Sequence, residues 1–206
     1  MKVLRVCLIL FLLQLGALFL ATSCCEELYT YQWSDLSLTH IDNRGAEPIE
    51  ASDNRLSAIA YALRVHMGFD FVYQQPCFKG FINSAYATSC LETYSTNDTI
   101  VGISVFPLSD FDENHLSGTS LEDYFAAKRR NSVTTYSSLE EKLAQAVPIA
   151  DFLEQINEQA EYDLFTDFDL LLLKEPTLDS VFQFVVEVEL SSSAVLRDTT
   201  ESIVLY

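Results

Sequence analysis

Residues 59–73 read Ile-Ala-Tyr-Ala-Leu-Arg-Val-His-Met-Gly-Phe-Asp-Phe-Val-Tyr, and this stretch decides the fold class. Large apolar or aromatic side chains occupy every second position from Ile59 to Tyr73, and smaller or polar residues fill most positions between them. Side chains alternate between the two faces of a β-strand, so a strand places the large residues on one core face, whereas a helix scatters them. The stretch therefore predicts one long strand, or two strands bent at Gly68.

The same period-two pattern recurs on both sides of this stretch. Aromatic residues alternate with polar ones over 29–33, and the apolar positions then change parity at Leu36 and Leu38, which predicts a bulge near Asp35. Four consecutive leucines, 170–173, predict a strand that is buried on both faces. Further strands are expected over 100–106, 164–174 and 182–190, and then from 194 and over 202–205, after a turn at 191–193.

The pattern changes to helical spacing over about 119–160. Ser120 can cap a short helix that starts at Leu121, and Ser137 or Ser138 can cap a second helix. Pro148 ends that helix and begins another, in which four apolar residues share one face: Ile149, Phe152, Leu153 and Ile156. About seven strands with this helical insertion predict a mainly β fold. We expect an antiparallel β-sandwich, with an immunoglobulin-like Greek key as the preferred topology.

The first 23 residues have the layout of a secretory signal peptide. Lys2 and Arg5 precede a run of 15 mostly apolar residues, Val6 to Leu20, and small residues follow up to Ser23. The run is shorter than the roughly 20 residues that a membrane-spanning helix needs, so a permanent transmembrane anchor is the lesser alternative. The expected organisation is a leader over 1–23 and one extracytoplasmic domain over 24–206.

The end of the leader resembles a bacterial lipobox. Leu-Ala-Thr-Ser-Cys, residues 20–24, places small residues directly before Cys24, although Ala21 stands where lipoboxes prefer leucine. The resemblance implies cleavage before Cys24 and acylation of that residue. Ordinary signal peptidase would also accept Ala21 and Ser23, and would release a free protein. Glu26 and Glu27 resemble an acidic signal for the outer membrane, so we expect an outer-membrane lipoprotein that faces either the cell surface or the periplasm.

The net charge restricts the possible partners. Without its leader the chain holds 10 basic and 30 acidic residues, a formal charge near −20. A polyanion gains nothing from counterion release on DNA or RNA, so nucleic-acid binding is excluded. An anionic membrane surface would repel the domain, so its attachment has to come from the lipid.

Three cysteines remain once Cys7 leaves with the leader and Cys24 carries lipid. Of these, Cys77 and Cys90 form the expected disulfide in an oxidising compartment, and Cys25 is left over. Closing so short a loop is worth about 3 kcal/mol. The alternative is that both residues stay reduced thiols.

Several motifs together resemble a group of small Bacteroidetes lipoproteins that carry a domain of unknown function. They are the lipobox, an early Tyr-x-Trp strand at 31–33, the segment Pro107–His115, and the strand Phe182–Leu190. The resemblance implies an anchored extracytoplasmic domain and brings no known activity or site.

One segment approaches a calcium-loop pattern. Asp110, Asp112 and Asn114 occupy positions one, three and five, but His115 stands at the glycine position and Leu121 at that of the bidentate glutamate. An acidic loop that caps the neighbouring helix is the alternative. With no catalytic signature around the serines and cysteines either, we expect no metal, no cofactor and no enzymatic activity.

Two further features point to carbohydrate. Tyr29, Tyr31 and Trp33 lie on one face of the first strand and would form an aromatic platform for a sugar ring, unless that face is buried. Three Asp-Ser/Thr triplets resemble O-glycosylation sites of exported Bacteroidetes proteins, with the hydroxyls on Thr99, Ser180 and Thr199.

The sequence therefore favours a lipid-anchored, non-enzymatic binding or accessory module with an envelope protein or glycan as partner. The first alternative is a structural envelope spacer or assembly protein without a small ligand. A hydrolase that uses surface carboxylates is the second.

Overall fold

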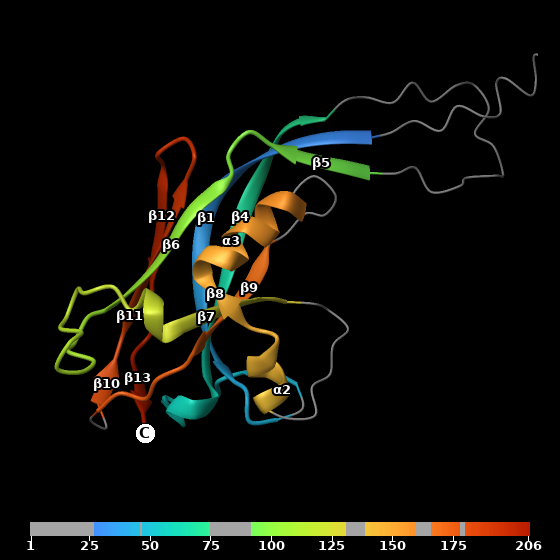
Figure 1. Cartoon of the computed structure of the whole chain (residues 1–206). Coiled ribbons are helices and arrows are strands. Elements are labelled where there is room, and N and C mark those ends of the chain that lie inside the picture. The colour runs from blue at the N-terminus through green and yellow to red at the C-terminus, as the bar shows by residue number, and fades with distance from the viewer. Residues whose placement is uncertain (1–26, 46, 75–91, 131–138, 160–165, 178–179) are drawn as a thin grey trace, which may run out of the picture.

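The computed structural model describes residues 27–45, 47–74, 92–130, 139–159, 166–177 and 180–206. These residues form three β-sheets with short helices beside them (Figure 1). Most neighbouring strands run antiparallel; β1–β5 and β3–β13 are parallel pairs. The predicted mainly β class with antiparallel sheets is confirmed.

The largest sheet, sheet A, is built on β1 and β4. Its order is β2-β1-β4-β9-β7-β8, and β5 also pairs with β1. Since β4 occupies one edge of β1, β2 and β5 share the other edge, at opposite ends of the strand. The strands are β1 (Glu27–Asp42), β2 (Ile49–Glu50), β4 (Tyr61–Gln74), β5 (Glu92–Thr96), β7 (Phe125–Arg129), β8 (Val147–Pro148) and β9 (Asp167–Leu172).

The single long strand and the bulge near Asp35 are confirmed. The predicted strand over 59–73 is β4, and Ile59 lies just before it in the 3-10 helix η1 (Ala58–Ala60). The pairing of β1 with β4 shifts register between Trp33 and Asp35, and Asp35 pairs with Gly68. A Cβ atom on Gly68 would lie 1.6 Å from Oδ1 of Asp35. Glycine at position 68 therefore leaves room for the Asp35 carboxylate, which the bulge brings onto β4 and which a Cβ atom would displace.

The remaining strands form two three-stranded sheets. The predicted strand over 182–190 is broken at Gln183 into β10 and β11, which belong to different sheets. Sheet B has the order β10-β13-β3, and sheet C has the order β12-β11-β6. Their strands are β3 (Arg55–Leu56), β6 (Ile100–Pro107), β10 (Ser180–Phe182), β11 (Phe184–Leu190), β12 (Val195–Thr199) and β13 (Ile203–Leu205).

One main hydrophobic core joins the three sheets. It contains Val65 and Phe168 of sheet A, Val186 of sheet C and Leu205 of sheet B, all fully buried. The opposite face of sheet A holds a smaller cluster of Ile41, Ala62 and Leu171. The consecutive leucines of β9 therefore contribute to two cores, as their sequence predicts, and only Leu173, beyond the strand, is exposed.

The predicted helical insertion at about 119–160 is only partly helical. It holds the 3-10 helix η2 (Glu122–Tyr124) and the helices α2 (Leu139–Ala144) and α3 (Ile149–Gln159). It also holds β7 and β8, which the helical spacing did not predict, and β7 lies between β9 and β8 in sheet A. Residues 125–129 contain the helix formers Ala, Lys and Arg, but pairing with β9 outweighs that local preference. As predicted, Ile149, Phe152 and Ile156 of α3 face the core.

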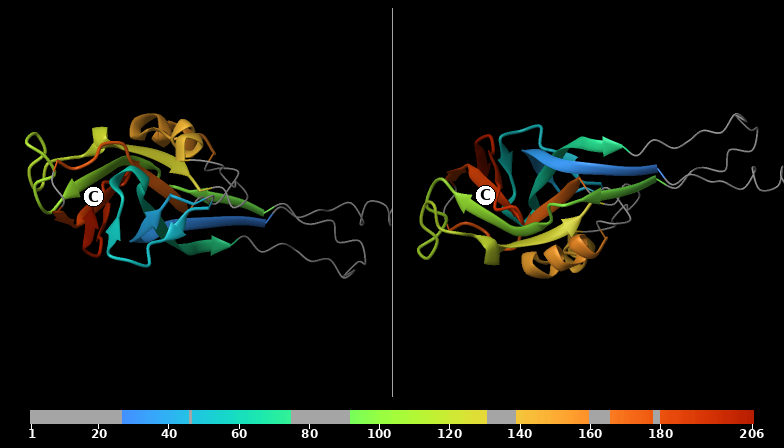
Figure 2. Two further views of the ribbon diagram at one scale, coloured as in Figure 1. Left: turned by 90° about the horizontal axis from the view of Figure 1, so that it is seen from below. Right: turned by 90° about the horizontal axis from the view of Figure 1, so that it is seen from above.

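One end of the β1–β4 pairing, together with β5, extends beyond the body of the molecule. Figures 1 and 2 show the first part of β1, the end of β4 and all of β5 running out together from the body, with the C-terminus at the opposite end. We call residues 27–31, 71–74 and 92–96 the arm. Among the helices formed by the described residues, none is both long and apolar enough to cross a bilayer.

Gly68→Ala is expected to lower the free energy of unfolding by about 1–2 kcal/mol, because the new Cβ overlaps the Asp35 carboxylate and forces it out of its rotamer. Urea denaturation of the wild type and the variant measures this loss. Asp35→Ala removes the overlapping atoms, so the Gly68→Ala substitution is expected to cost little in that background. Equal losses in both backgrounds would refute the steric explanation.

Candidate functional site

A continuous row of aromatic rings connects the core to the arm. Ring centroids lie 5.0 Å apart for Trp33 and Tyr31, and 5.7 Å apart for Tyr31 and Phe69. The row continues from Phe69 to Phe71 at 5.2 Å, from Phe71 to Tyr29 at 5.4 Å, and from Tyr29 to Tyr94 at 5.5 Å. We call these six residues the aromatic row. Rings at these separations stabilise one another beyond simple burial.

Burial changes along the row and decides between the two interpretations of the first strand. Tyr31 is 2 % exposed and Trp33 7 %, and both belong to the main core. The indole Nε1 of Trp33 donates a hydrogen bond to the carbonyl of Asp98 at 3.0 Å, and burial raises the pKa of Tyr31 to about 12. Tyr31 and Trp33 therefore stabilise the fold and present no flat sugar platform, and Tyr29 is half-buried.

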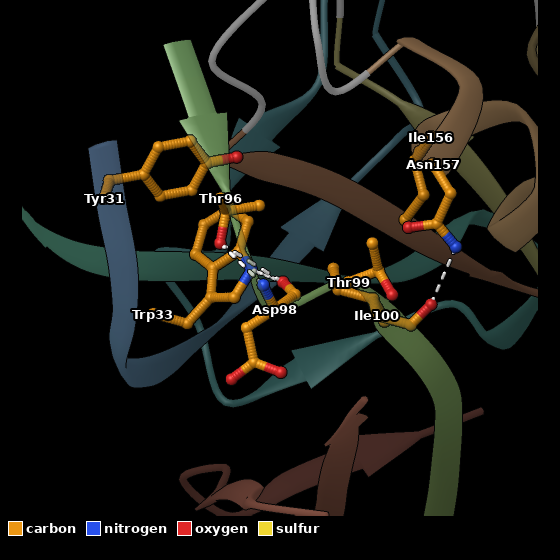
Figure 3. A pocket seen from close by; sticks show the side chains of 8 residues that line it. All are labelled: Tyr31, Trp33, Thr96, Asp98, Thr99, Ile100, Ile156 and Asn157. Atoms are coloured by element: carbon orange, nitrogen blue, oxygen red, sulfur yellow. Dashed lines mark hydrogen bonds between the residues drawn. The ribbon is translucent and has the colours of Figure 1, made fainter. Parts of the chain in front are cut away.

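A small open hollow lies where Tyr31 and Trp33 meet α3 and the start of β6 (Figure 3). Asn157 of α3 stands at its side and donates a hydrogen bond to the carbonyl of Ile100 at 2.8 Å. The other residues that line it are Thr96, Asp98, Thr99 and Ile156. Its hydroxyl and amide groups could hydrogen-bond a small uncharged group, but Tyr31 and Trp33 expose little ring surface to it.

Asp98 does not provide the hollow with a free acid. Its carboxylate accepts hydrogen bonds from the backbone and hydroxyl of Ser192 at 2.9 and 2.7 Å and from the hydroxyl of Ser191 at 3.1 Å. Burial acts to raise the pKa of Asp98, but these hydrogen bonds outweigh it and hold the pKa below its ordinary value. Asp98 thus fixes the turn between β11 and β12. The sequence indicated Tyr31, Trp33 and Thr99 separately, and gave no signal for Asn157.

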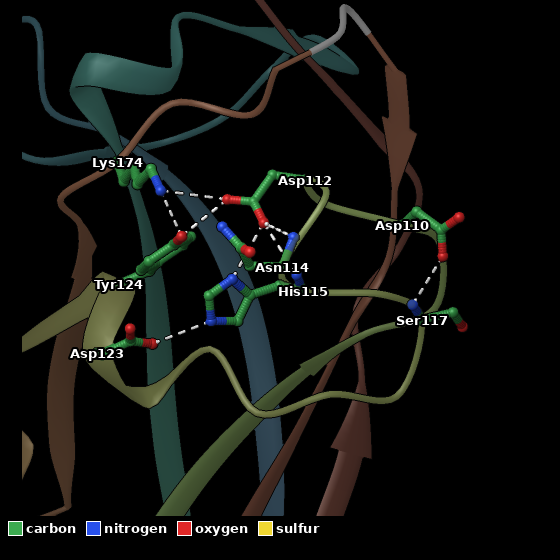
Figure 4. Close-up of polar contacts among 8 residues, drawn as sticks. All are labelled: Asp110, Asp112, Asn114, His115, Ser117, Asp123, Tyr124 and Lys174. Carbon is green, nitrogen blue, oxygen red and sulfur yellow. Dashed lines mark hydrogen bonds and ion pairs between the residues drawn. The ribbon is translucent and has the colours of Figure 1, made fainter.

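A second polar cluster surrounds Asp112 (Figure 4). One carboxylate oxygen accepts from the backbone amides of Asn114 and His115, at 2.8 and 2.9 Å, and lies 3.1 Å from the His115 ring. The other accepts from the hydroxyl of Tyr124 at 2.7 Å and from Nζ of Lys174 at 3.2 Å. Lys174 also contacts the Tyr124 hydroxyl, and its Nζ lies 4.2 Å from the centre of that ring.

These contacts decide what the acidic loop does. Burial acts to raise the pKa of Asp112, but the hydrogen bonds from Tyr124, Asn114 and His115 outweigh it and keep the pKa well below its ordinary value. Hydrogen bonds to Tyr124 and Asp112 raise the pKa of Lys174. Asp110 accepts instead from the backbone amide of Ser117 at 2.9 Å, and Figure 4 shows it apart from Asp112. The Asp112 carboxylate is thus held by the Lys174 ammonium group and by backbone amides. The described residues contain no group of three or more His, Cys, Asp or Glu side chains placed to bind a metal ion.

The three histidines lie at separate places. The ring nitrogens of His40 lie 2.9 Å from the Tyr61 hydroxyl and 2.9 Å from the Glu201 carbonyl, and burial lowers the pKa of His40. Since a carbonyl only accepts, Nε2 of His40 carries the hydrogen in the neutral ring. His66 pairs with Asp167, and His115 belongs to the Asp112 cluster.

The predicted modification sites differ in what the structure says of them. Thr99 and Thr199 are exposed, and Ser180 begins β10. Cys24, Cys77 and Cys90 lie outside the described residues, so lipidation and the disulfide stay predictions.

Together these observations define the class: a mainly β domain with an acidic surface, a hollow beside an aromatic row, and buried carboxylates that are tied to neighbouring donors. The chain belongs to a family described as "Domain of unknown function (DUF5034)", whose model matches residues 33–201. The expected membership of a domain of unknown function is thereby confirmed. Neither a curated protein nor a solved structure matches the chain.

Asp112→Asn is expected to destabilise the protein at neutral pH, because it removes the negative charge beside Lys174 and replaces one of the two acceptor oxygens by an NH2 donor. The folded pKa of Asp112 lies below its unfolded value of about 3.9, so its carboxylate stabilises the fold fully above that pH and ceases to do so as the pH falls toward the folded pKa. The stability difference between wild type and variant should therefore be constant above about pH 5 and shrink below about pH 4. Urea denaturation over this range measures it. Asp110→Asn is the matched control and should have little effect at neutral pH; a difference for Asp112→Asn that grows on acidification would contradict the assignment.

O-glycosylation at Thr99 or Thr199 would add discrete sugar masses to the native protein. Intact mass spectrometry of protein from its natural host should show these masses, and Thr99→Val or Thr199→Val should each remove one of them. A mass equal to the polypeptide and its lipid alone rules out the modification.

Proposed function

We propose that the protein is a Bacteroidetes-type lipoprotein, anchored to the outer membrane through acylated Cys24, in which the β domain is a non-enzymatic binding or accessory module. Its partner would be an envelope protein or glycan. The observation that carries this proposal is that β1, the strand on which sheet A is built, begins at Glu27, only three residues after Cys24.

The charge of the chain supports an anchor made of lipid. The domain near −20 gains no attraction from an anionic membrane surface, and acyl chains supply the apolar area that holds a protein at a bilayer. An acidic domain at the surface also stays soluble at the high local concentration that a membrane creates.

The contacts of the acids support a binding role over a hydrolytic one. Asp98, Asp112 and Asp169 accept hydrogen bonds from Ser192, Tyr124 and Arg64 respectively. A general acid or base needs a carboxyl that is free to exchange its proton with substrate. The hollow beside Trp33 instead offers contacts for a neutral ligand.

The finer architecture is also a proposal. An antiparallel sandwich is supported by the core that sheet A shares with sheets B and C. An immunoglobulin-like Greek key within that sandwich is the more specific form of the proposal, and an experimental structure compared with known sandwiches would test it.

Cys24→Ala is expected to trap the uncleaved precursor or to release the protein from the membrane, because no acyl chain can then be attached. Fractionation of cells, followed by intact mass measurement, detects either result. Cys25→Ala is the matched control, since it changes the neighbouring cysteine and leaves the acylated residue, and it should fractionate like the wild type.

Membrane association that is unchanged in Cys24→Ala would contradict the anchor. Crosslinking in intact cells with the same strains then tests the binding role. A defined envelope glycan or protein should be recovered with the wild type and less with Asn157→Ala, which alters the hollow. No enrichment over a membrane-tethered control domain would favour the spacer role.

A further inference from the structure

The arm differs from the rest of the chain in charge. The chain contains 30 acidic and 12 basic residues, yet positions 28–31, 71–73 and 93–96 hold none of them. These positions carry aromatic, apolar and hydroxyl side chains. Three strands that are separate in the sequence therefore bring together an uncharged surface at one end of the molecule (Figure 2).

The arm exposes aromatic side chains on both of its faces. Phe71 pairs with Tyr31 and Tyr73 pairs with Thr30. The register shifts by one residue between Thr30 and Tyr31, which are neighbours on β1. Their partners Tyr73 and Phe71 therefore lie on opposite faces of the sheet, although they are two residues apart on β4. Phe71 is 52 % exposed and Tyr73 is 54 % exposed. The surface of one folded partner would cover only one face of this ribbon, whereas a lipid bilayer would surround the ribbon and contact both of its faces.

The short stretch of chain between Cys24 and the arm also places the arm near the bilayer. An extended chain spans at most about 3.6 Å per residue, so Tyr29 lies within about 18 Å of Cys24. Half of a bilayer, including its headgroups, is about 20–22 Å thick. Tyrosine and tryptophan side chains concentrate at the headgroup level, because one end of the ring system is apolar and the polar group remains hydrated.

We propose that the arm is immersed in the headgroup region of the membrane that holds the acylated Cys24, with Phe71 and Tyr73 contacting lipid on its two faces. This inference rests on the proposed lipid anchor. Glu27 and Glu92 are paired positions at the start of β1 and β5, so the arm favours zwitterionic over anionic headgroups.

The immersed arm fixes how the domain stands on the membrane. β4 runs from η1 to the arm, and its 14 residues span about 45 Å at the rise of a strand. The amide of Ala58 in η1 donates to the carbonyl of Tyr206 at 3.0 Å, which places η1 at the C-terminal end of the molecule. That end is then held away from the bilayer, and Ile59, 56 % exposed on η1, remains in water.

Tryptophans introduced one at a time, beside the native Trp33, test whether each face of the arm is immersed. Acylated protein is purified in detergent and reconstituted into phosphatidylcholine vesicles that contain brominated lipid, which quenches tryptophan on contact. Phe71→Trp and Tyr73→Trp report on the two faces, and Ile59→Trp is the control of matched exposure. The added fluorescence of both arm variants should shift to the blue and be largely lost to bromine, while that of Ile59→Trp is retained. Replacing part of the lipid with phosphatidylglycerol should weaken the quenching.

The outcomes separate the two proposals. Purified protein whose mass shows no acyl group refutes the anchor and the immersion together. Acylated protein on vesicles, with arm tryptophans no more quenched than Ile59→Trp, refutes the immersion alone. Quenching of one arm variant without the other shows that lipid reaches a single face and also overturns the proposal. Circular dichroism of each variant confirms that it is folded, and the two arm positions provide independent readouts.

Discussion

The antiparallel pairing of β1 with β4 is the constraint on which the rest of the structure depends. It runs from Tyr29 opposite Gln74 to Asp42 opposite Tyr61, and β2, β5 and β9 all add to its edges. A shift of one residue would move Leu63, Val65 and Met67 from the main core to the opposite face of the sheet. The bulge at Asp35 and the glycine opposite it fit this register, since any other residue at position 68 would displace that carboxylate from its present position. The same pairing carries the aromatic row from the core out to the arm.

The acidic chain folds because its buried carboxylates have donors. Nε and Nη2 of Arg64 on β4 donate to the two oxygens of Asp169 on β9 at 2.8 and 3.1 Å, and both side chains are largely buried. Such a pair contributes little net stability but is costly to break, so it favours the β4–β9 register over its alternatives. Asp112 is satisfied in the same way at the other side of the molecule, by backbone amides, Tyr124 and Lys174. Within the described part of the chain every buried polar side-chain atom has a hydrogen-bond partner. Carboxylates that are fixed in this manner are structural. The arm, whose only charged residues are Glu27 and Glu92, and the hollow beside Trp33 are the surfaces that differ from the acidic remainder.

Much of the fold follows from alternation along the chain, and little of the site does. The strand over 59–73, the bulge near Asp35 and the doubly buried leucines could be predicted because each depends on side chains close in sequence. β7 could not, because Phe-Ala-Ala-Lys-Arg has the local preferences of a helix and becomes a strand only between β9 and β8. The break at Gln183 could not be predicted either, because the alternation of apolar residues continues through Gln183 while the chain passes from sheet B to sheet C. Asn157 reaches the hollow, and Lys174 reaches Asp112, across 57 and 62 positions of sequence.

The sequence by itself determined the strand-rich class and the acidic character of the domain, because composition and periodicity are local properties of the chain. The leader over 1–23 is likewise predicted from local composition alone. Only the tertiary structure decided the fate of the aromatic residues in the first strand. The alternation of Tyr29, Tyr31 and Trp33 is compatible with a sugar platform or with a core, and burial depends on what packs against that face. Sheet pairing buries Trp33 and Tyr31, exposes Phe71 of the neighbouring strand, and gathers the uncharged segments of three strands at one end. The physical reason is that exposure and contact arise between elements distant in sequence, where no local pattern of residues can specify them.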